Sequence, residues 1–294
     1  MKKTVYVVDA MNYIHRAYYS LPDNITSPDG LLTNAVLGYL RTLLRIINEH
    51  KPEYMAAAFE KDTSFRKNMF AAYKANRKQP PENLEAQFEH CRRITQAIGV
   101  ACIEVDNYEA DDVIGTIAAR MSAIGHRVVV VTGDKDMSQL VSGAVMVYDI
   151  GKGHWLDEAA VREKFGVTPA QIPDLLALHG DHIDNIPGVM GVGAKTARQI
   201  LSVYGSIEDL TDTSLSEKLR FRGRDEILRR IRENMETVRV SRRLATICCE
   251  APIDVSPEIL RYRRADRRTL DPLCRELGFM GVVEDIPLAQ PTLF

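Results

Sequence analysis

The stretch VVVVTGDKD, residues 128–136, joins an unbroken run of β-branched residues to an acidic turn. Such a run is typical of a strand that is covered on both faces, as in a parallel sheet. Comparable short runs lie at residues 4–8, 54–59, 100–105 and 145–148. Helical patterns separate several of them, at residues 31–48, 84–97 and 110–124. This alternation predicts an α/β fold with a mostly parallel twisted sheet flanked by helices.

Strand signals stop after about residue 167, and the later patterns are helical, at residues 168–178, 195–204, 206–210 and 224–240. We therefore expect an α/β domain over residues 1–167, a smaller helical region over 168–250 and a C-terminal extension over 251–294.

The composition is that of an ordinary globular protein, with 45% hydrophobic and 27% charged residues among 294. No apolar run approaches about 18 residues and no signal peptide is recognisable, so we expect no membrane contact. The five scattered cysteines form no C-x-x-C pair, which argues against a zinc site and a disulfide framework. The scattered, odd-numbered cysteines fit a reduced, cytoplasmic setting. The net charge of -2 hides a split, because Lys and Arg are concentrated in residues 195–243. A phosphate-bearing partner is therefore not excluded.

Acidic residues follow the expected strands at similar positions. After strands they are Asp9, Glu60, Glu109, Asp111, Asp112, Asp134 and Asp136, and after the helical pattern 168–178 they are Asp181 and Asp184. Because the carboxyl ends of parallel strands meet at one edge of a sheet, four strands would deliver acids to one crevice.

Two of these groups have simpler explanations when each is considered alone. The acids of residues 109–112 are explained by helix capping, where the helix dipole favours negative charge, and residues 133–136 by an ordinary turn. Together, however, two carboxylates about 4 Å apart repel by roughly 4 kcal/mol at an effective dielectric near 20. Such a cluster persists only if cations neutralise it or the groups protonate. A set made almost wholly of carboxylates favours Mg²⁺ or Mn²⁺, and two such ions are the usual apparatus of phosphodiester hydrolysis.

Residues 61–81 interrupt the rhythm of strands and helices. They combine the cations Arg66, Lys67, Lys74, Arg77 and Lys78 with the aromatic residues Phe65, Phe70 and Tyr73. Cations bind phosphates and aromatic rings stack on unpaired bases, so the segment suits single-stranded nucleic acid. The simpler alternative is a solvated basic helix.

Five motifs carry a family resemblance: VVDAMNYIHRAYY, TSFRKNMFAAYKANR, YEADDVIG, VTGDKDMSQLV and LLALHGDHIDNIPGVMGVGAKTA. Over about residues 4–250 the chain resembles the bacterial 5′-3′ exonuclease and flap endonuclease family, like the 5′-nuclease domain of DNA polymerase I but in free-standing form. The resemblance implies a PIN-like nuclease core, with a helical arch at about residues 61–98.

The resemblance also implies roles for matching residues. A first metal ion would be held by Asp9, Glu109 and Asp111, with Asp112 and Asp134 close by, and a second by Asp136, Asp181 and Asp184. Lys74 and Arg77 would draw the scissile phosphate toward the metals. The implied DNA contacts are Arg16 near the 5′ strand, Phe65 and Arg66 in the basic segment, and Tyr73 stacked on the terminal base. The chain departs from the family pattern at Ala10, where Gly is usual, and at Glu60, where Asp is usual.

The run from Gly188 to Ala197, GVMGVGAKTA, joins two helical patterns. Small residues let a backbone approach a phosphate, and the following helix offers free N–H groups, although a plain Gly-rich connection would look similar. The resemblance implies a helix–hairpin–helix-type grip on duplex DNA that holds K⁺ through carbonyl groups. The expected contacts are Gly188, Gly191, Gly193, Lys195 and Thr196.

The last five residues, QPTLF, end in two apolar side chains. They resemble the peptide with which bacterial proteins bind the sliding clamp, so Gln290, Leu293 and Phe294 are expected to contact a clamp. The alternative is a tail that docks on its own domain or has no fixed structure.

The function expected from these observations is a structure-specific 5′-nuclease, both a 5′-3′ exonuclease and a 5′-flap endonuclease. It would use two or more Mg²⁺ ions, with Mn²⁺ as a substitute, on DNA with a 5′ flap or 5′ end or on RNA primers during replication or repair. We expect a monomer. Two alternatives are a non-catalytic DNA-structure-binding protein, which would lack the acids, and a PIN-like RNase, which would lack the arch and the duplex grip.

Overall fold

The structure is a computed structural model that describes residues 3–61 and 64–289 and is built around one six-stranded sheet. The order of the strands across the sheet is β3-β2-β1-β4-β5-β6. Their bounds are β1 Thr4–Asp9, β2 Tyr54–Ala58, β3 Ala101–Ile103, β4 Arg127–Val131, β5 Val145–Asp149 and β6 His154–Leu156. Strands β1 to β5 are parallel, and β6 pairs antiparallel with β5.

The sheet reverses its direction of growth beside β1. The chain first adds β2 and β3 on one side, then crosses to the other side and adds β4 and β5. Val8 pairs with Ala57 of β2 and with Val131 of β4, so all three strands end together. In open parallel sheets, ligands bind in the crevice at the carboxyl ends of the strands where the order reverses.

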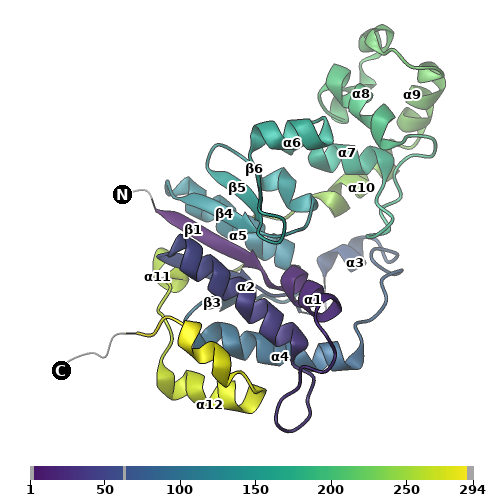
Figure 1. The fold of residues 1–294 in the computed structure, drawn as a ribbon. Coiled ribbons are helices and arrows are strands. Elements are labelled where there is room, and N and C mark those ends of the chain that lie inside the picture. Colours follow the sequence, from purple (N-terminus) through teal and green to yellow (C-terminus); the bar gives the residue numbers. More distant parts are fainter. Residues whose placement is uncertain (1–2, 62–63, 290–294) are drawn as a thin grey trace.

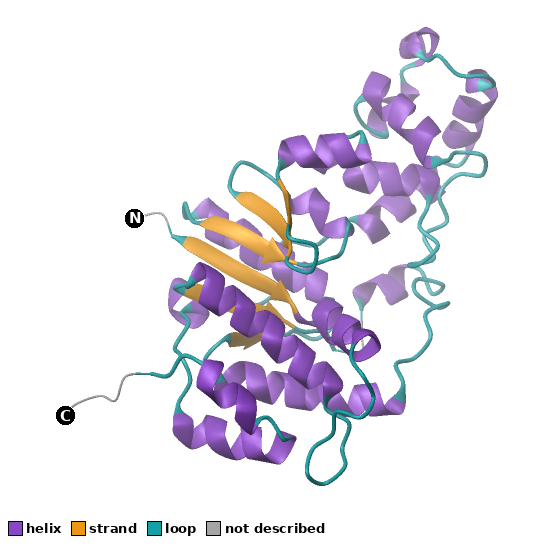
Figure 2. Ribbon diagram, in the orientation of Figure 1, coloured by secondary structure: helices purple, strands orange, loops and turns teal. Residues whose placement is uncertain are grey.

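Helices cover both faces of the sheet (Figures 1 and 2). Alternate residues of β1 face opposite sides, as the pleat requires: Val5 and Val7 join one core, and Tyr6 and Val8 the other. The first core includes α5 (Ala110–Ala123) and α6 (Glu158–Phe165). The second core includes α1 (Ala10–Ser20), α2 (Asn34–His50), α4 (Glu82–Ala97) and α12 (Arg267–Leu277).

A helical region stands at one end of the molecule, at the upper right of Figure 1. It contains α7 (Ile172–His179), α8 (Ala194–Tyr204), α9 (Arg224–Glu233) and α10 (Met235–Ala245). Buried residues of α7 and α8, such as Leu176 and Ile200, belong to the same apolar cluster as Ile114 of α5. The helical region therefore rests on the sheet domain through a shared core.

The C-terminal extension returns to the sheet domain. Its helices are α11 (Pro257–Leu260) and α12, and the buried Leu270, Leu273 and Leu277 of α12 join the core that holds α2 and α4. Most of the extension is thus part of the core. Residues 290–294, on which the clamp prediction rests, lie outside the described residues.

The predicted α/β class and parallel sheet are confirmed, while several details differ. The sequence reading missed α1, α6 and the antiparallel β6, which are short and lack long periodic patterns. The single helix expected at 224–240 is two helices, α9 and α10, because Asn234 leaves the helical conformation with φ -110° and ψ 20°. Among the described residues, no helix combines the length and the apolarity needed to span a bilayer.

Candidate active site

The acids that follow the strands gather at the carboxyl edge of the sheet. Asp9 is the last residue of β1 and is only 4% exposed. Its Oδ2 accepts a hydrogen bond of 2.7 Å from Thr132 Oγ1, in the turn after β4, and its Oδ1 accepts one of 3.0 Å from the backbone N of Asn12. The carboxyl ends of β1 and β4 are therefore joined by a side-chain hydrogen bond.

The turn after β4 is shaped by its own acids. The backbone N of Asp134 donates to Thr132 Oγ1 at 2.9 Å, and the N of Asp136 donates to Asp134 Oδ1 at 2.8 Å. A short 3-10 turn, Asp136–Leu140, begins there. Residues 133–136 thus do form a turn, as the simpler explanation requires. The Asp136 carboxylate nevertheless lies near other acids, Asp134 first among them.

The pKa values of these acids show how closely they are grouped. Burial raises the pKa of Asp9 to about 7, and the charges of Asp134 and Glu60 add to the rise. Burial and the neighbouring Asp134 likewise raise the pKa of Asp136 to about 7. The pKa of Asp111 lies well above its usual value because of burial, with further contributions from Asp134 and Asp9. Acids from different strand ends therefore repel one another at one site.

Cationic side chains relieve part of this repulsion. Lys74 Nζ lies 2.7 Å from Glu109 Oε2 and 3.9 Å from Asp184 Oδ2, and thus between acids assigned to the two metal sites. Although burial raises the pKa of Glu109, Lys74 and Arg66 outweigh it and hold that pKa below its usual value. Arg77 is bonded to Asp184.

The loop that carries Asp181 and Asp184 closes on itself through a bridge between Asp181 and Ile186. Asp181 is 7% exposed, and its Oδ2 accepts a bond of 2.6 Å from Lys135 Nζ. Burial raises the pKa of Asp181, but the bond from Lys135 and a backbone bond from Ile183 leave it lowered overall.

The basic segment lies against this loop. The backbone N of Lys74 donates to Asp184 O at 3.0 Å, and Asn185 Nδ2 donates to Ala72 O at 2.7 Å. The segment is less helical than expected: α3 covers only Phe65–Met69, turns follow, and α4 belongs to the core of the sheet domain. The cations of the segment are thus positioned by backbone pairing with the acidic loop.

Asp112 and Arg66 require a correction. Their side chains form a buried two-bond pair, with Arg66 Nη1 and Nη2 each 2.7 Å from an oxygen of Asp112. Asp112 is 0% exposed and also accepts from the backbone N of Glu109, in a capping box at the start of α5. Neither side chain has groups free for a metal ion or a phosphate. Asp112 therefore acts as a cap of α5, and the guanidinium of Arg66 is engaged within the protein rather than presented to DNA.

Three other expected DNA contacts are also engaged within the protein. Tyr73 is 3% exposed and its hydroxyl donates to Glu109 at 3.2 Å, so its ring is not presented for stacking on a base. The ring of Phe65 packs against Tyr108, with centroids 5.4 Å apart. Arg16 is paired with Asp149, at 3.4 Å.

The donor set suits divalent cations that prefer oxygen ligands. Burial, with a further contribution from neighbouring acids, raises the pKa values of Asp9, Asp111 and Asp136, and the nearby Lys and Arg do not outweigh this rise. Within residues 3–61 and 64–289, no three Asp, Glu, His or Cys side chains already converge at metal-binding distances. Lys74 lies among these acids, and its ammonium group occupies a position between them. In this arrangement Glu109 and Asp184 are therefore paired with Lys74 rather than with an ion.

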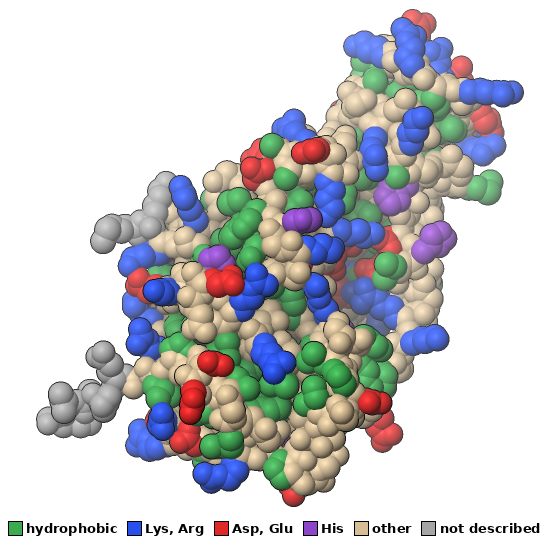
Figure 3. Space-filling model, viewed as in Figure 1, with side chains coloured by type: hydrophobic (Ala, Val, Ile, Leu, Met, Phe, Trp, Pro, Cys, Tyr) green, Lys and Arg blue, Asp and Glu red, His purple; other side chains and the backbone are tan. Residues whose placement is uncertain are grey.

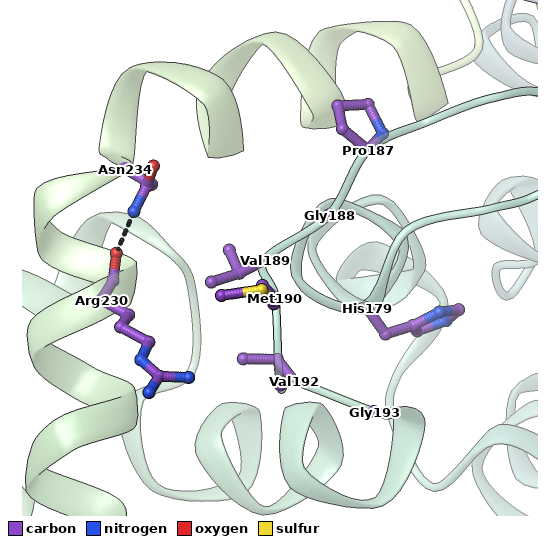
Figure 4. A pocket seen from close by; sticks show the side chains of 10 residues that line it. His179, Pro187, Gly188, Val189, Met190, Val192, Gly193, Arg230 and Asn234 are labelled. Atoms are coloured by element: carbon purple, nitrogen blue, oxygen red, sulfur yellow. Dashed lines mark hydrogen bonds between the residues drawn. The ribbon is translucent and has the colours of Figure 1, made fainter.

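The glycine-rich run forms a hairpin between α7 and α8, beside a cavity of about 780 Å³. The cavity is lined by residues 187–193 together with His179, Arg230 and Asn234 (Figure 4). Gly188 has φ +62°, and a Cβ added there would lie 2.4 Å from the backbone N of Gly180, so the position requires glycine. Gly193 precedes α8, and a Cβ there would meet nothing within 4 Å. Lys195 is exposed in the first turn of α8.

Two family models match the chain in sequence. The model described as "5′-3′ exonuclease, N-terminal resolvase-like domain" matches residues 4–166, and the one described as "5′-3′ exonuclease, C-terminal SAM fold" matches residues 167–268. The chain belongs to the 5′-3′ exonuclease family. The resemblance expected from the five motifs is therefore confirmed.

Relatives in this family include free-standing proteins and parts of larger ones. The 5′-3′ exonuclease of Aquifex aeolicus is 35% identical over 285 residues, which cover 97% of this chain and 95% of the relative. DNA polymerase I of Bacillus caldotenax is 39% identical over 293 residues, covering 97% of this chain but 32% of the relative. The chain thus spans about a third of the length of its DNA polymerase I relatives.

Solved structures share the fold of this chain. A T5 5′-exonuclease with bound divalent metal ions (zinc) matches with a TM-score of 0.68 and 19% identity, covering 93% of this chain and 99% of that one. The catalytic core of Rad2 in complex with DNA substrate matches with a TM-score of 0.64 and 12% identity, covering 97% and 91%. At these identities the similarity concerns the fold alone.

Charge is distributed unevenly over the surface of this family member (Figure 3). In that view, basic side chains gather over the helical region and around a recess in which acidic side chains are visible.

Two residues that contact the site were not predicted from the sequence. Lys135, inside the motif at 133–136, neutralises Asp181, and Gln139 bonds to Asp136 O at 3.1 Å. A lysine between two aspartates was the available signal for the first; the second had none.

Proposed function

We propose that this chain hydrolyses phosphodiesters of DNA near a free 5′ end, acting as a structure-specific 5′-3′ exonuclease and 5′-flap endonuclease. The observation that carries the proposal is the crevice at the carboxyl edge of the sheet. There Asp9, Asp111 and Asp136 have raised pKa values, and Lys74 lies against Glu109. Family membership supports the same reaction.

The acids fit a pair of Mg²⁺ ions, with Mn²⁺ as a substitute. Asp9, Glu109 and Asp111, with Asp134, would hold one ion, and Asp136, Asp181 and Asp184 the other. Glu60, whose pKa is raised by burial, would act beside the first group. Bound ions of this kind lower the pKa of water and stabilise charge on phosphate oxygens.

Lys74 and Arg77 would change partners when substrate arrives. In the absence of DNA they are bonded to Glu109 and Asp184. A phosphate offers a competing anionic partner, so both cations would turn toward it and leave the carboxylates free. In this way the basic segment would place the scissile phosphate beside the acids and at the same time open the space for the metal ions.

The hairpin and the first turn of α8 would bind the duplex part of the substrate. Backbone N–H groups at a helix start bind phosphates without reading sequence, and the exposed Lys195 and the half-buried Thr196 lie in that turn. Gly188, Gly191 and Gly193 would let the duplex approach, with K⁺ held by hairpin carbonyl groups. RNA primers annealed to DNA are further substrates under this proposal.

We also propose that the chain acts as a monomer in replication or repair and that Gln290, Leu293 and Phe294 bind a sliding clamp. The support for the clamp is the sequence pattern, since these residues lie outside the described ones. Deleting residues 290–294 should abolish clamp binding and leave cleavage without the clamp unchanged. Unchanged clamp binding would rule this partner out.

The test of the proposed function is cleavage of a labelled 5′-flap duplex with Mg²⁺ and with EDTA. We expect cutting near the base of the flap in Mg²⁺ and none in EDTA. A protein that binds the flap duplex but leaves it intact at every Mg²⁺ concentration would instead be the non-catalytic DNA-structure-binding protein. Preferential cutting of single-stranded RNA would indicate the RNase.

A further inference from the structure

The segment Leu244–Cys248, here called the strap, comprises the last two residues of α10 and the three that follow, and it passes beside the acids. Its backbone is bonded to the buried Arg66–Asp112 pair at several points. Leu244 O accepts from Arg66 Nε at 3.0 Å and Thr246 O from Arg66 Nη2 at 2.8 Å, while the N of Cys248 donates to Asp112 Oδ1 at 2.8 Å. The strap is therefore fixed to the start of α5, which carries Glu109 and Asp111.

A second connection joins the strap to the turn that begins with Asp136. Gln139 Nε2 donates to Asp136 O at 3.1 Å and to Ala245 O at 3.0 Å. Gln139 Oε1 accepts from the backbone N of Ile247 at 2.9 Å. One side-chain amide thus holds the backbone of a candidate metal ligand against the strap.

The strap also forms part of the wall of the site. Leu244, Ala245 and Ile247 line the same small cavity as Glu109, Asp111, Asp136 and Asp184. A displacement of the strap would therefore change both the bonds and the packing behind the acids.

At its other end the strap is fixed to the helices around the hairpin. Arg242 of α10 lies 2.7 Å from Asp174 of α7, and Asp174 is 2% exposed. The other oxygen of Asp174 accepts from the backbone N of Ile207, just after α8, at 3.3 Å. Because α7 and α8 flank the hairpin, α10 and the strap connect the expected duplex grip with the acids.

We propose that the strap couples duplex binding at the hairpin to the position of Asp136, and that Gln139 is the positioning residue of this coupling. The inference rests on the proposed function. Gln139 acts through the backbone of Asp136 rather than on the substrate. Since a displacement of about 1 Å at a reacting centre can cost about 100-fold in rate, a small movement of the strap is sufficient for a large effect.

The test compares two 5′-flap substrates in Mg²⁺. One has a long duplex, and the other has a duplex shortened until Lys195→Ala no longer weakens its binding. For the wild type we expect a higher kcat on the long duplex. In Gln139→Met, which keeps the side-chain length but loses the amide, this kcat advantage should fall to near one, while the Kd for the long duplex stays unchanged.

Gln171→Met is the matched control, because Gln171 also makes an amide bridge, to Leu201 O at 3.2 Å and Gly205 O at 2.7 Å, but within the helical region. It should lower stability to a similar degree and keep the kcat advantage. If Gln139→Met does not fold, Gln139→Glu gives the same comparison, since it keeps the acceptor for Ile247 and loses both donors.

Each remaining outcome is decisive. An undiminished kcat advantage in a folded Gln139 variant, or a wild type without any advantage, would overturn the coupling. Equal losses on both substrates would reduce Gln139 to a structural residue. A wild type that cuts neither substrate in Mg²⁺ would refute the proposed function itself, which separates the two failures.

Discussion

The crevice that holds Asp9, Asp111 and Asp136 and the glycine-rich hairpin at residues 187–193 are proposed to contact the same substrate by opposite means. The crevice gathers mainly acidic, buried side chains, such as Asp9 at 4% exposure, and the hairpin is an exposed loop in which Met190 is 81% exposed. Burial raises the energy of unpaired charge and so prepares the crevice for cations. The hairpin needs only shape, which Gly188 supplies. Changes in the crevice should therefore affect chemistry directly. Changes in the hairpin should act first on binding and reach the chemistry only through the strap.

The largest expected effect is that of Asp134→Ala. Asp134 raises the pKa values of Asp9, Asp111 and Asp136, so it stands at the centre of the cluster. Loss of one group that stabilises transition-state charge costs about 10²–10³-fold, and we expect at least that loss in kcat with unchanged DNA affinity. Single-turnover cleavage of a 5′ flap measures it, with the exposed Asp254→Ala as control. Wild-type cutting by Asp134→Ala would remove the acids from the mechanism.

Lys74→Ala should come next, with kcat about 100-fold lower because the phosphate loses its cationic partner. The same change removes the ammonium group that lies between Glu109 and Asp184. We therefore expect half-saturation at a lower Mg²⁺ concentration than in the wild type, measured by metal titration of DNA-free protein. Lys164→Ala, an exposed lysine of α6, is the control. Weaker metal binding in Lys74→Ala would contradict the competition between Lys74 and the ions.

Gly188→Ala tests the hairpin side of the comparison. A side chain in the left-handed region costs about 1–3 kcal/mol, and here it also meets the backbone of Gly180. We expect weaker binding of duplex DNA and a higher KM, with kcat at saturating substrate nearly unchanged. Gly193→Ala should keep the wild-type melting temperature, because φ there is -87° and the space is open. A selective loss of kcat in Gly188→Ala would break the division between grip and chemistry.

The smallest expected effect is on stability as a function of pH. In metal-free protein the folded pKa of Asp136, about 7, exceeds the ordinary value of 3.8. The folded state therefore holds more protons between these values, and this group's contribution to stability is lost as pH rises through about 7. Relative to Asp136→Asn, wild type in EDTA should lose melting temperature from pH 5 to 8. Added Mg²⁺ should restore more of it at pH 8 than at pH 6. A difference between the two proteins that does not change with pH would contradict this account.

The sequence predicted the parts of the site that depend on strand ends and failed where contacts are long-range. Asp9 and Asp134 follow β-branched runs, so the rule that parallel strands share an edge was enough to bring them together. Arg66 looked like a surface cation because nothing local indicates a partner at Asp112. Tyr73 was expected to face DNA for the same reason, since its burial depends on the loop at 181–186.

The fold, like the site, was predicted where the signal is local and missed where it depends on long-range contacts. Long periodic segments such as α2 and α5 were located correctly, because an amphipathic pattern is a local property. The break at Asn234 and the return of α12 to the core depend on tertiary packing, which one sequence does not display. The bridge formed by Gln139 belongs to this class as well.

The buried Arg66–Asp112 pair has a consequence for protein engineering. It fastens the base of the basic segment to residues far away in the chain, at 112 and at 244–248. The basic segment therefore cannot be exchanged between relatives by itself. A chimaera that imports residues 61–81 from a relative without a matching arginine would strand a carboxylate in the interior. Grafts intended to change substrate preference should transplant all three pieces together.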